Sequence, residues 1–478
     1  MSERTVRVPI VAAAVGALLA TNACAVGPKY QRPVMPAPTA FHESLPTGWT
    51  EAQPGDSAPR GRWWEVFGDS ALDALESQVS ISNQNVLAAE AQFRAARAAV
   101  RVTRAGQFPT VSTTPSATVS GTGAASGTKR QYSLPIDVTY DADVWGSIRH
   151  SVAANAAAAQ ASAAELENAR LLYRAELGAD YFQIQGLDAE QRLLEATVKS
   201  YEQYLQLTQD RFQGGVASLG DVALARTQLE TVRAQLTDVG IARAQFEHAI
   251  AVLTGRPPAD LSIPPSTTEV PPPVLSVGLP STLLQRRPDI AAAERQVAAA
   301  NEQIGVAKAA FYPALSFGGS AGSQAAAIAD LLTTPTRLWS VGVQVAETLF
   351  DGGKRRAQVR LTQAEYDATV ANYRQTVLTG FQQVEDALVE LRTLAGEADI
   401  VERAIAAAQQ SVDIATAQYR GGLASYLQVV TAQTSLLQNQ RATVDLLTRR
   451  LVASVSLIQA LGGGWDVSQL PSTQDVRR

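Results

Sequence analysis

Hydrophobic residues recur at helical spacing over very long stretches of this chain. Residues 146–213 contain no proline and consist largely of strong helix formers. At about 1.5 Å per residue, such a run would span roughly 100 Å as one helix. The next segment keeps apolar residues three and four apart, at Val222, Ala225, Leu229, Val232, Leu236, Val239, Phe246, Ile250 and Leu253. This spacing is typical of a coiled-coil seam, and we expect a helical hairpin over 146–254.

The turn of this hairpin contains a glycine pair that recurs later in the chain. Residues 211–218 read RFQGGVAS, and residues 418–425 read QYRGGLAS. A glycine pair permits the positive φ values with which a chain leaves one helix and enters the next. The second copy also follows a long proline-free run and precedes another helical pattern, which predicts a second hairpin over 352–461. We therefore expect two copies of one elongated unit.

Before each hairpin the spacing of hydrophobic residues changes from the helical period to an alternation at every second residue. In the clearest run, polar residues alternate with Tyr132, Leu134, Ile136, Val138 and Tyr140. The alternation predicts a strand with one apolar and one polar face. Together with a weaker partner it forms a strand pair over 108–144, and a second pair is expected over 312–350.

Two environments suit such strands, and the pattern is compatible with both. In a soluble sheet the polar face meets water, so Asp137 and Asp141 would be solvated strand positions. In a transmembrane barrel the apolar face meets lipid, and Asp137 and Asp141 would then face a lumen. No segment after the first residues approaches the ~20 apolar residues of a spanning helix, so a membrane crossing would have to use strands.

The remaining segments have the composition of connections, and the prolines of the central one prevent helix. We match the end of the second hairpin, Leu461-Gly462-Gly463, to Leu253-Thr254-Gly255 in the first. The expected parts are an export signal over 1–23, an extended arm over 24–62, a first repeat over 63–255, a Pro-rich linker over 256–282, a second repeat over 283–463 and a loose tail over 464–478.

The first residues have the pattern of an export signal. Arg4 and Arg7 precede an uncharged run that extends to Ala20, and Cys24 follows shortly afterwards. Cleavage before Cys24 would leave its thiol at the new N-terminus, where bacterial lipoproteins carry their acyl chains. We expect lipid attachment at Cys24. A buried or idle cysteine is the alternative, because the three residues before Cys24 depart from the usual signal.

Composition narrows the classes of function. The net charge of −5 and pI near 5.5 give no general attraction to nucleic acid, so we set nucleic-acid binding aside. The single cysteine excludes an intramolecular disulfide, and the three histidines are scattered, so we expect no metal and no cofactor. GGGW at 462–465 lacks the Lys-Ser/Thr of a phosphate loop. With no catalytic constellation in view, we expect no enzyme.

Four strands per chain cannot close a barrel, and an open sheet edge is too costly in lipid. Several chains would therefore contribute strands to one barrel, while the long hairpins form a tube roughly 100 Å long beside it. The expected class is mainly α with a small β part and a two-fold internal repeat. This arrangement is that of a duct.

The motifs in their order match a known family. The chain resembles the TolC-like outer membrane factors, specifically the NodT-type lipoprotein branch that serves RND-type efflux systems, in CAVGPKYQRP near the start, LLQRRPDIAAAE at 283–294, the paired glycine turns and the repeat. The resemblance implies a homotrimer with a shared 12-stranded transmembrane β-barrel in outer membrane lipid and a trimeric α-helical barrel through the periplasm. It also implies that the lower end stays closed until a periplasmic adaptor and an inner-membrane RND-type pump dock.

The resemblance also implies roles for the turns. The adaptor-contacting tips would be Gly214, Gly215, Val216, Ala217, Ser218, Gly421, Gly422, Leu423, Ala424 and Ser425. Family members commonly carry acidic residues just inside these tips, and Asp221 fits that pattern at the periplasmic aperture. Where related proteins often carry a second acid, this chain has Thr431. Asp221 has an ordinary alternative role, because a carboxylate in the first turn of a helix caps free N–H groups.

The favoured function is a passive exit duct of a tripartite efflux pump in the cell outer membrane. One alternative is a periplasmic coiled-coil adaptor or tether lipoprotein, although an adaptor needs only one hairpin and no lipid-facing strands. Another is the exit duct of a type I protein secretion system. The exported substrate is left open, since a duct takes its specificity from its pump.

Overall fold

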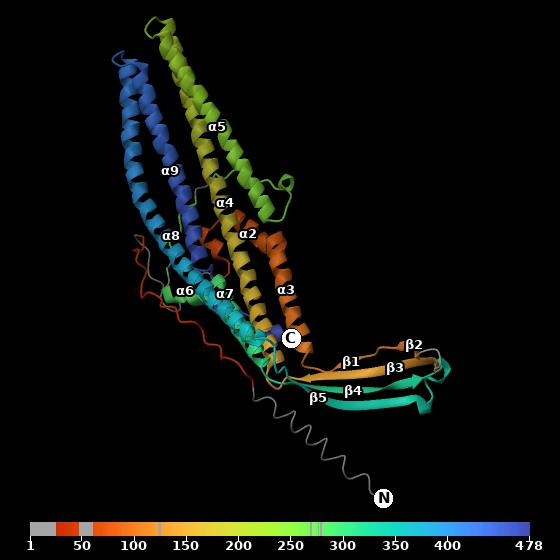
Figure 1. Ribbon diagram of the computed structural model, residues 1–478. Coiled ribbons are helices and arrows are strands. Elements are labelled where there is room, and N and C mark those ends of the chain that lie inside the picture. The colour runs from red at the N-terminus through yellow and green to blue at the C-terminus, as the bar shows by residue number, and fades with distance from the viewer. Residues whose placement is uncertain (1–24, 47–60, 123–125, 268–269, 276, 278–279) are drawn as a thin grey trace.

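The computed structural model describes residues 25–46, 61–122, 126–267, 270–275, 277 and 280–478. Two long helical hairpins extend from one end of a helical middle section, and one β-sheet extends from the other end (Figure 1). The chain is mainly helical with a small β part, as predicted. The principal elements are η2 (Trp63–Phe67), α2 (Ser70–Ser82), α3 (Gln84–Ala105), β1 (Thr110–Ser112), β2 (Ser116–Thr122), β3 (Ser126–Ala142), α4 (Ser147–Gln213), α5 (Leu219–Leu253), α6 (Pro280–Arg286), α7 (Pro288–Ala309), β4 (Ala314–Ala325), β5 (Arg337–Ala346), α8 (Lys354–Arg420), α9 (Tyr426–Ala460) and α10 (Thr473–Arg477).

The two hairpins repeat each other in length. Helices α4 and α8 have 67 residues each, and helices α5 and α9 have 35 each. Both long helices begin directly after a glycine with positive φ, Gly146 at 85° and Gly353 at 91°. Because residues other than glycine rarely adopt this conformation, the sharp turn from strand to helix depends on these glycines.

Each return helix ends against the helix break that opens its own repeat. Asn83, between α2 and α3, donates from Nδ2 to the carbonyl of Leu253 at 2.9 Å. Arg287, between α6 and α7, donates from Nη1 to the carbonyl of Ala460 at 2.9 Å. We call these two contacts the repeat joints. Both satisfy a carbonyl that the helix end leaves without an intrahelical partner.

The repeat joints correct the match made from sequence. Gly255 follows the end of α5 with φ of 71°, and Gly462 follows the end of α9 with φ of 94°. The position equivalent to Gly255 is therefore Gly462, and the expected match to Gly463 is wrong by one residue. Gly462, Gly463 and Gly464 all have positive φ.

The sheet is antiparallel throughout and continuous across the two repeats. Strands β1 and β2 lie end to end along β3, which pairs with β4, which pairs with β5. The described residues thus form four strand positions, and the first is split into two segments. Pro115 lies in the gap between them, where its missing N–H cannot interrupt the hydrogen-bond ladder.

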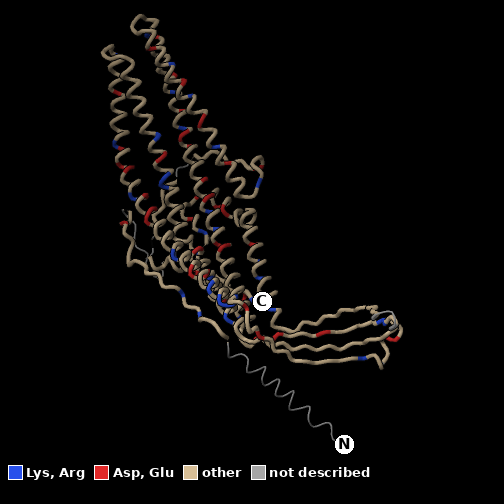
Figure 2. The backbone as a smooth tube through the Cα atoms, viewed as in Figure 1, with Lys and Arg blue, Asp and Glu red and all other residues tan. Residues whose placement is uncertain are grey.

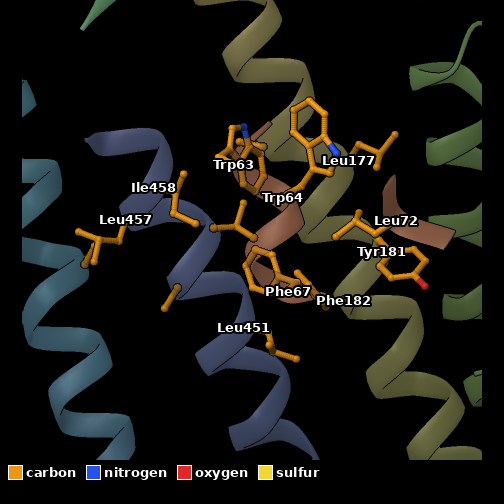
Figure 3. Packing of buried hydrophobic residues seen from close by; sticks show 14 of the residues in the cluster. Trp63, Trp64, Phe67, Leu72, Leu177, Tyr181, Phe182, Leu451, Leu457 and Ile458 are labelled. Carbon is orange, nitrogen blue, oxygen red and sulfur yellow. The ribbon is translucent and has the colours of Figure 1, made fainter. Parts of the chain in front are cut away.

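An aromatic core ties the N-terminal helices to the hairpins. Trp63 and Trp64 of η2 are both buried, with ring centroids 5.8 Å apart, and Phe67 lies 4.7 Å from Phe182 of α4. Leu451 and neighbouring residues of α9 belong to the same cluster (Figure 3). This core fixes the middle of the molecule, and both hairpin ends extend beyond it.

The expectation of a loose C-terminal tail is wrong. Trp465 is buried in a cluster with Ala164 of α4, and Val476 of α10 packs against Val100 and Val152. Helix α10 is short, but a capping box between Ser472 and Asp475 fixes its first turn. The tail therefore lies against α3 and α4 close to the sheet.

Residues 25–46 of the N-terminal arm are extended and lie against the second repeat. The amide of Asn301 on α7 donates to the carbonyl of Pro28 at 3.1 Å, and the backbone N–H groups of His42 and Glu43 donate to the carboxylate of Glu385 at 2.7 and 2.9 Å. The expected export signal and Cys24 lie outside the described residues.

Candidate functional site

The two hairpins end in turns of identical backbone geometry. We call residues 214–218 and 421–425 the hairpin tips. In the first tip, Gly215 and Val216 donate to the carbonyls of Phe212 and Arg211, both at 2.9 Å. In the second, Gly422 and Leu423 donate to the carbonyls of Tyr419 and Gln418 at 3.1 and 2.9 Å. This is the Schellman pattern of helix termination.

Only one glycine of each pair needs its conformational freedom. Gly215 and Gly422 both have φ of 74°, whereas Gly214 and Gly421 have φ of −77° and −76°. The left-handed residue is the one that Schellman caps require to be glycine. The expected role of the glycine pair in the turn is therefore carried by its second member.

Both hairpin tips present an apolar side chain to solvent. Val216 is 68% exposed, and Leu423 is 85% exposed. Each is followed by a partly buried alanine, Ala217 or Ala424, and then by a serine that begins the return helix. Exposed apolar residues gathered at the end of a long projection are typical of a surface that a partner covers.

Asp221 lies in a capping box at the start of α5. Its backbone N–H donates to Oγ of Ser218 at 3.1 Å, and its Oδ2 accepts from the backbone N–H of Ser218 at 3.1 Å. The capping contact considered from sequence is therefore present. The second tip differs, because Ser425 makes no side-chain cap. Thr431 is exposed, and its Oγ1 donates to the carbonyl of Leu427 at 2.9 Å.

Just inside the tips, one arginine joins the two hairpins. The guanidinium carbon of Arg211, in the last turn of α4, lies 4.7 Å from the ring centroid of Tyr419, in the last turn of α8. Its Nη1 also donates to the carbonyl of Arg420 at 3.0 Å. A cation over an aromatic face stabilises such a contact by roughly 0.5–2 kcal/mol. The tips are thus held to one another within the chain.

Tyr419 belongs to a buried group of aromatic residues. Its ring centroid lies 5.2 Å from that of Tyr426, and both side chains are buried. Burial, with a further contribution from the neighbouring Tyr419, raises the pKa of Tyr426. Arg211 and Tyr419 both stand within the two turn sequences, RFQGGVAS and QYRGGLAS, but no local pattern predicts their contact.

The sheet has one polar and one apolar face, as the alternation predicted. Residues directly opposite one another share a face. Asp137 is opposite Ser112 and Ser320, and Asp141 is opposite Ser316, so both acids lie on the polar face. Figure 2 shows few charged residues along the strands, with charge gathered mainly at the two ends of the sheet.

The apolar face of the sheet is uncovered in the single chain. Val138 is opposite both Val111 and Gly319, and Gly319 is opposite Val341. Trp339, on the same face of β5, is 80% exposed. A face this apolar requires a cover of lipid or protein.

Within the described ranges, no helix combines the length and the apolar character that crossing a membrane would need. The same residues contain no group of three or more His, Cys, Asp or Glu side chains arranged to hold a metal ion.

Comparison with known proteins gives consistent matches. Residues 75–256 and 279–463 match the family model described as outer membrane efflux protein. The antibiotic efflux pump outer membrane protein ArpC of Pseudomonas putida is 32% identical to this chain, over 92% of this chain and 93% of ArpC. The cation efflux system protein CusC of Escherichia coli is 28% identical over 93% and 97%. Among solved structures, the outer-membrane channel OprN superposes with a TM-score of 0.86 at 28% identity, over 92% of this chain and 100% of OprN.

Proposed function

The chain belongs to the outer membrane efflux protein family and is an outer-membrane exit duct of an efflux system, and on this premise we propose that three copies assemble into one passive duct. A periplasmic adaptor and an inner-membrane RND-type pump deliver the substrate and supply the energy. The observation that carries this proposal is the pair of equal hairpins joined to a sheet with segregated faces.

The sheet supports assembly from several copies. Strand β5 and the segments β1 and β2 are edges within one chain, and they leave backbone groups unpaired. In lipid these groups must be paired, so edges of neighbouring copies join into a closed barrel. The apolar face with Trp339 contacts lipid, and the polar face with Asp137 and Asp141 lines the lumen. The number three follows from the family resemblance.

Cys24 carries the lipid anchor in this proposal. Ala25, the next residue, is the first described one, and the amide of Val26 donates to the carbonyl of Trp145 at 3.2 Å, directly after β3. The arm therefore begins where the sheet meets the helices. An acyl chain attached at this level would enter the same membrane as the sheet.

The hairpin tips are the proposed adaptor contacts, and the residues just inside them are the proposed aperture. Val216 and Leu423 supply apolar contact, while Asp221 and Thr431 narrow the closed end. The link from Arg211 to Tyr419 keeps the two hairpins of one chain together at that end.

The names of relatives leave the substrate class open. One relative is named for antibiotic efflux and another for cation efflux. The substrate of this duct follows from the pump that it serves. A type I secretion system is the second candidate, because a passive duct suits either source of substrate.

Reconstitution tests the duct. The purified protein is expected to run as a trimer after chemical crosslinking and to conduct ions stepwise in a planar lipid bilayer. A monomer without conductance would instead indicate the periplasmic adaptor or tether.

The role of Asp221 can be separated from its capping contact. Asp221→Asn removes the charge and keeps an oxygen acceptor for the Ser218 N–H, whereas Ser218→Ala removes the cap and keeps the charge. If the carboxylate closes the aperture, Asp221→Asn raises basal bilayer conductance several-fold. Ser218→Ala should leave conductance near wild type and cost about 0.5–2 kcal/mol of helix stability. Equal conductance in Asp221→Asn and wild type would reduce Asp221 to a capping residue.

A further inference from the structure

A cavity of about 650 Å³ opens where the helical part adjoins the sheet. It lies between the end of α3, the start of α4, α7 and the short helix α10. Its walls include Arg104, Arg149, His150, Glu302, Arg477 and Arg478. Neither the duct nor the adaptor contact proposed above uses these residues.

The acidic groups near this cavity already have partners. Nδ1 of His150 lies 2.6 Å from Oε2 of Glu302. Nε of Arg149 pairs with Oδ2 of Asp143 at 3.2 Å. Asp475, on α10, accepts from the hydroxyl and the backbone N–H of Ser472. Asp475 nevertheless keeps its negative charge, which interacts electrostatically with Arg478 and Arg97.

Three arginines in the cavity wall have no carboxylate within ion-pair distance among the described residues. In the part of the chain that the structure describes, Arg104, Arg477 and Arg478 form no ion pair with a carboxylate. Nη1 of Arg104 donates to the carbonyl of Arg477 at 3.1 Å, which fixes the two residues side by side. Nε of Arg477 is buried and has no hydrogen-bond partner among the described residues.

The cavity lies at the level where the proposed membrane boundary falls. Helix α3 ends at Ala105 and β1 begins at Thr110, so Arg104 is only a few residues from the sheet. A Cβ placed on Gly146 would lie 3.0 Å from Cβ of Ala25 and 3.4 Å from Nη2 of Arg149. The arm that follows the proposed lipid anchor therefore passes beside the cavity.

Aromatic residues mark the same level. The rings of Trp145 and Tyr312 stack with centroids 4.6 Å apart. Phe108, two residues before β1, is exposed. Tryptophan and tyrosine are enriched where lipid meets water. A membrane lipid at this level would present its phosphate to the cavity and its acyl chains to the apolar sheet face.

We propose that this cavity binds the phosphate headgroup of an anionic phospholipid, with the guanidinium groups of Arg104, Arg477 and Arg478 as its donors. This inference rests on the proposed placement of the sheet in the membrane. Guanidinium groups bind phosphate oxygens with paired hydrogen bonds, and basic pockets at a membrane boundary are known sites for anionic headgroups. The cavity is within the ~300–1,000 Å³ range of small-molecule sites.

Native mass spectrometry of the detergent-extracted protein tests the site. Titration with phosphatidylglycerol is expected to give a bound species, and titration with phosphatidylcholine a much weaker one. The double variant Arg104→Gln with Arg477→Gln should weaken phosphatidylglycerol binding at least tenfold. The matched control, Arg94→Gln with Arg101→Gln, removes the same charge from exposed positions of α3 outside the cavity and should bind like wild type.

A milder variant guards against loss of folding. Arg104 holds α10 through the carbonyl of Arg477, so the double variant could loosen this helix. Arg477→Gln alone leaves that contact in place and should weaken binding about threefold. Equal weakening in the control pair, or unchanged binding in Arg477→Gln and in the double variant, would overturn the proposal.

Two further measurements distinguish the lipid site from a site for a free anion and from the proposed duct function. Inorganic phosphate should not displace the lipid at equal concentration, because it lacks acyl chains; displacement would mean a site for a free anion and would overturn the lipid assignment. Conductance of the unsubstituted protein in a phosphatidylcholine bilayer, which contains no anionic lipid, measures duct activity without the proposed lipid site. Failure of the duct and failure of the lipid site therefore give different results.

Discussion

Replacement of Gly462 by alanine is expected to lower the free energy of unfolding by about 3–5 kcal/mol, the range of strongly destabilising single substitutions. Gly462 has φ of 94°, a conformation that costs an L-residue roughly 1–2 kcal/mol. In addition, a Cβ at this position would overlap the carbonyl oxygen of Arg286, which is backbone and cannot move aside cheaply. Gly255→Ala should behave alike, since its Cβ would overlap the carbonyl oxygen of Ser82.

Thermal unfolding followed by circular dichroism measures this effect, and the yield of crosslinked trimer reports assembly. Gly240→Ala is the matched control, because Gly240 lies inside α5 with nothing within 4 Å of an added Cβ. That control should gain about 0.5–1 kcal/mol from helix propensity. If Gly462→Ala unfolded at the same temperature as Gly240→Ala, the close approach of Gly462 to the backbone of Arg286 would not constrain the fold.

Glutamate at both hairpin tips is expected to abolish efflux. Val216→Glu combined with Leu423→Glu places a charge on each of the two exposed apolar tips. In the proposed adaptor contact these charges would be desolvated without a partner, which costs at least ~2 kcal/mol for residues central to an interface. We therefore expect resistance to fall at least tenfold, to the level of cells without a channel. The measurement is the minimal inhibitory concentration of a toxic pump substrate in a channel-deficient strain that expresses this channel together with its pump and adaptor.

The matched control keeps the apolar character of the tips. Val216→Leu combined with Leu423→Val exchanges the two side chains between the tips and should retain efflux. Crosslinked trimer yield must be equal in both double variants, so that a loss of efflux reports docking and not assembly. Efflux at wild-type level in the glutamate variant would move the adaptor contact away from the tips.

The helices could be predicted from the sequence because their signals are local. The hydrophobic period, the absence of proline and the glycine pairs can each be recognised within a single segment. Helix α4 begins at Ser147, within one residue of the expected start. The packed tail could not be predicted in this way. The burial of Trp465 and Val476 depends on helices far away in sequence, and a helix as short as α10 has little periodicity to detect.

The site was predictable to the same limited extent. The Schellman turns follow from the glycine pair, and the capping of Asp221 follows from its place after Ser218. The contact between Arg211 and Tyr419 joins separate hairpins, so no local pattern contains it. The same is true of Arg104 and Arg477, which only the fold brings together.

The equal lengths of the two hairpins imply a constraint on how this gene can change. A helical insertion of one turn in α4 and α5 alone would displace the first tip by about 5.4 Å relative to the second, although the proposed adaptor contact involves both tips. Side chains at equivalent positions of the two repeats can diverge independently, as Asn83 and Arg287 have done at the repeat joints. Insertions and deletions in the hairpins cannot accumulate independently, because a change of length in one hairpin requires an equal change in the other. The two repeats must therefore keep equal hairpin lengths, while their side chains are free to differ.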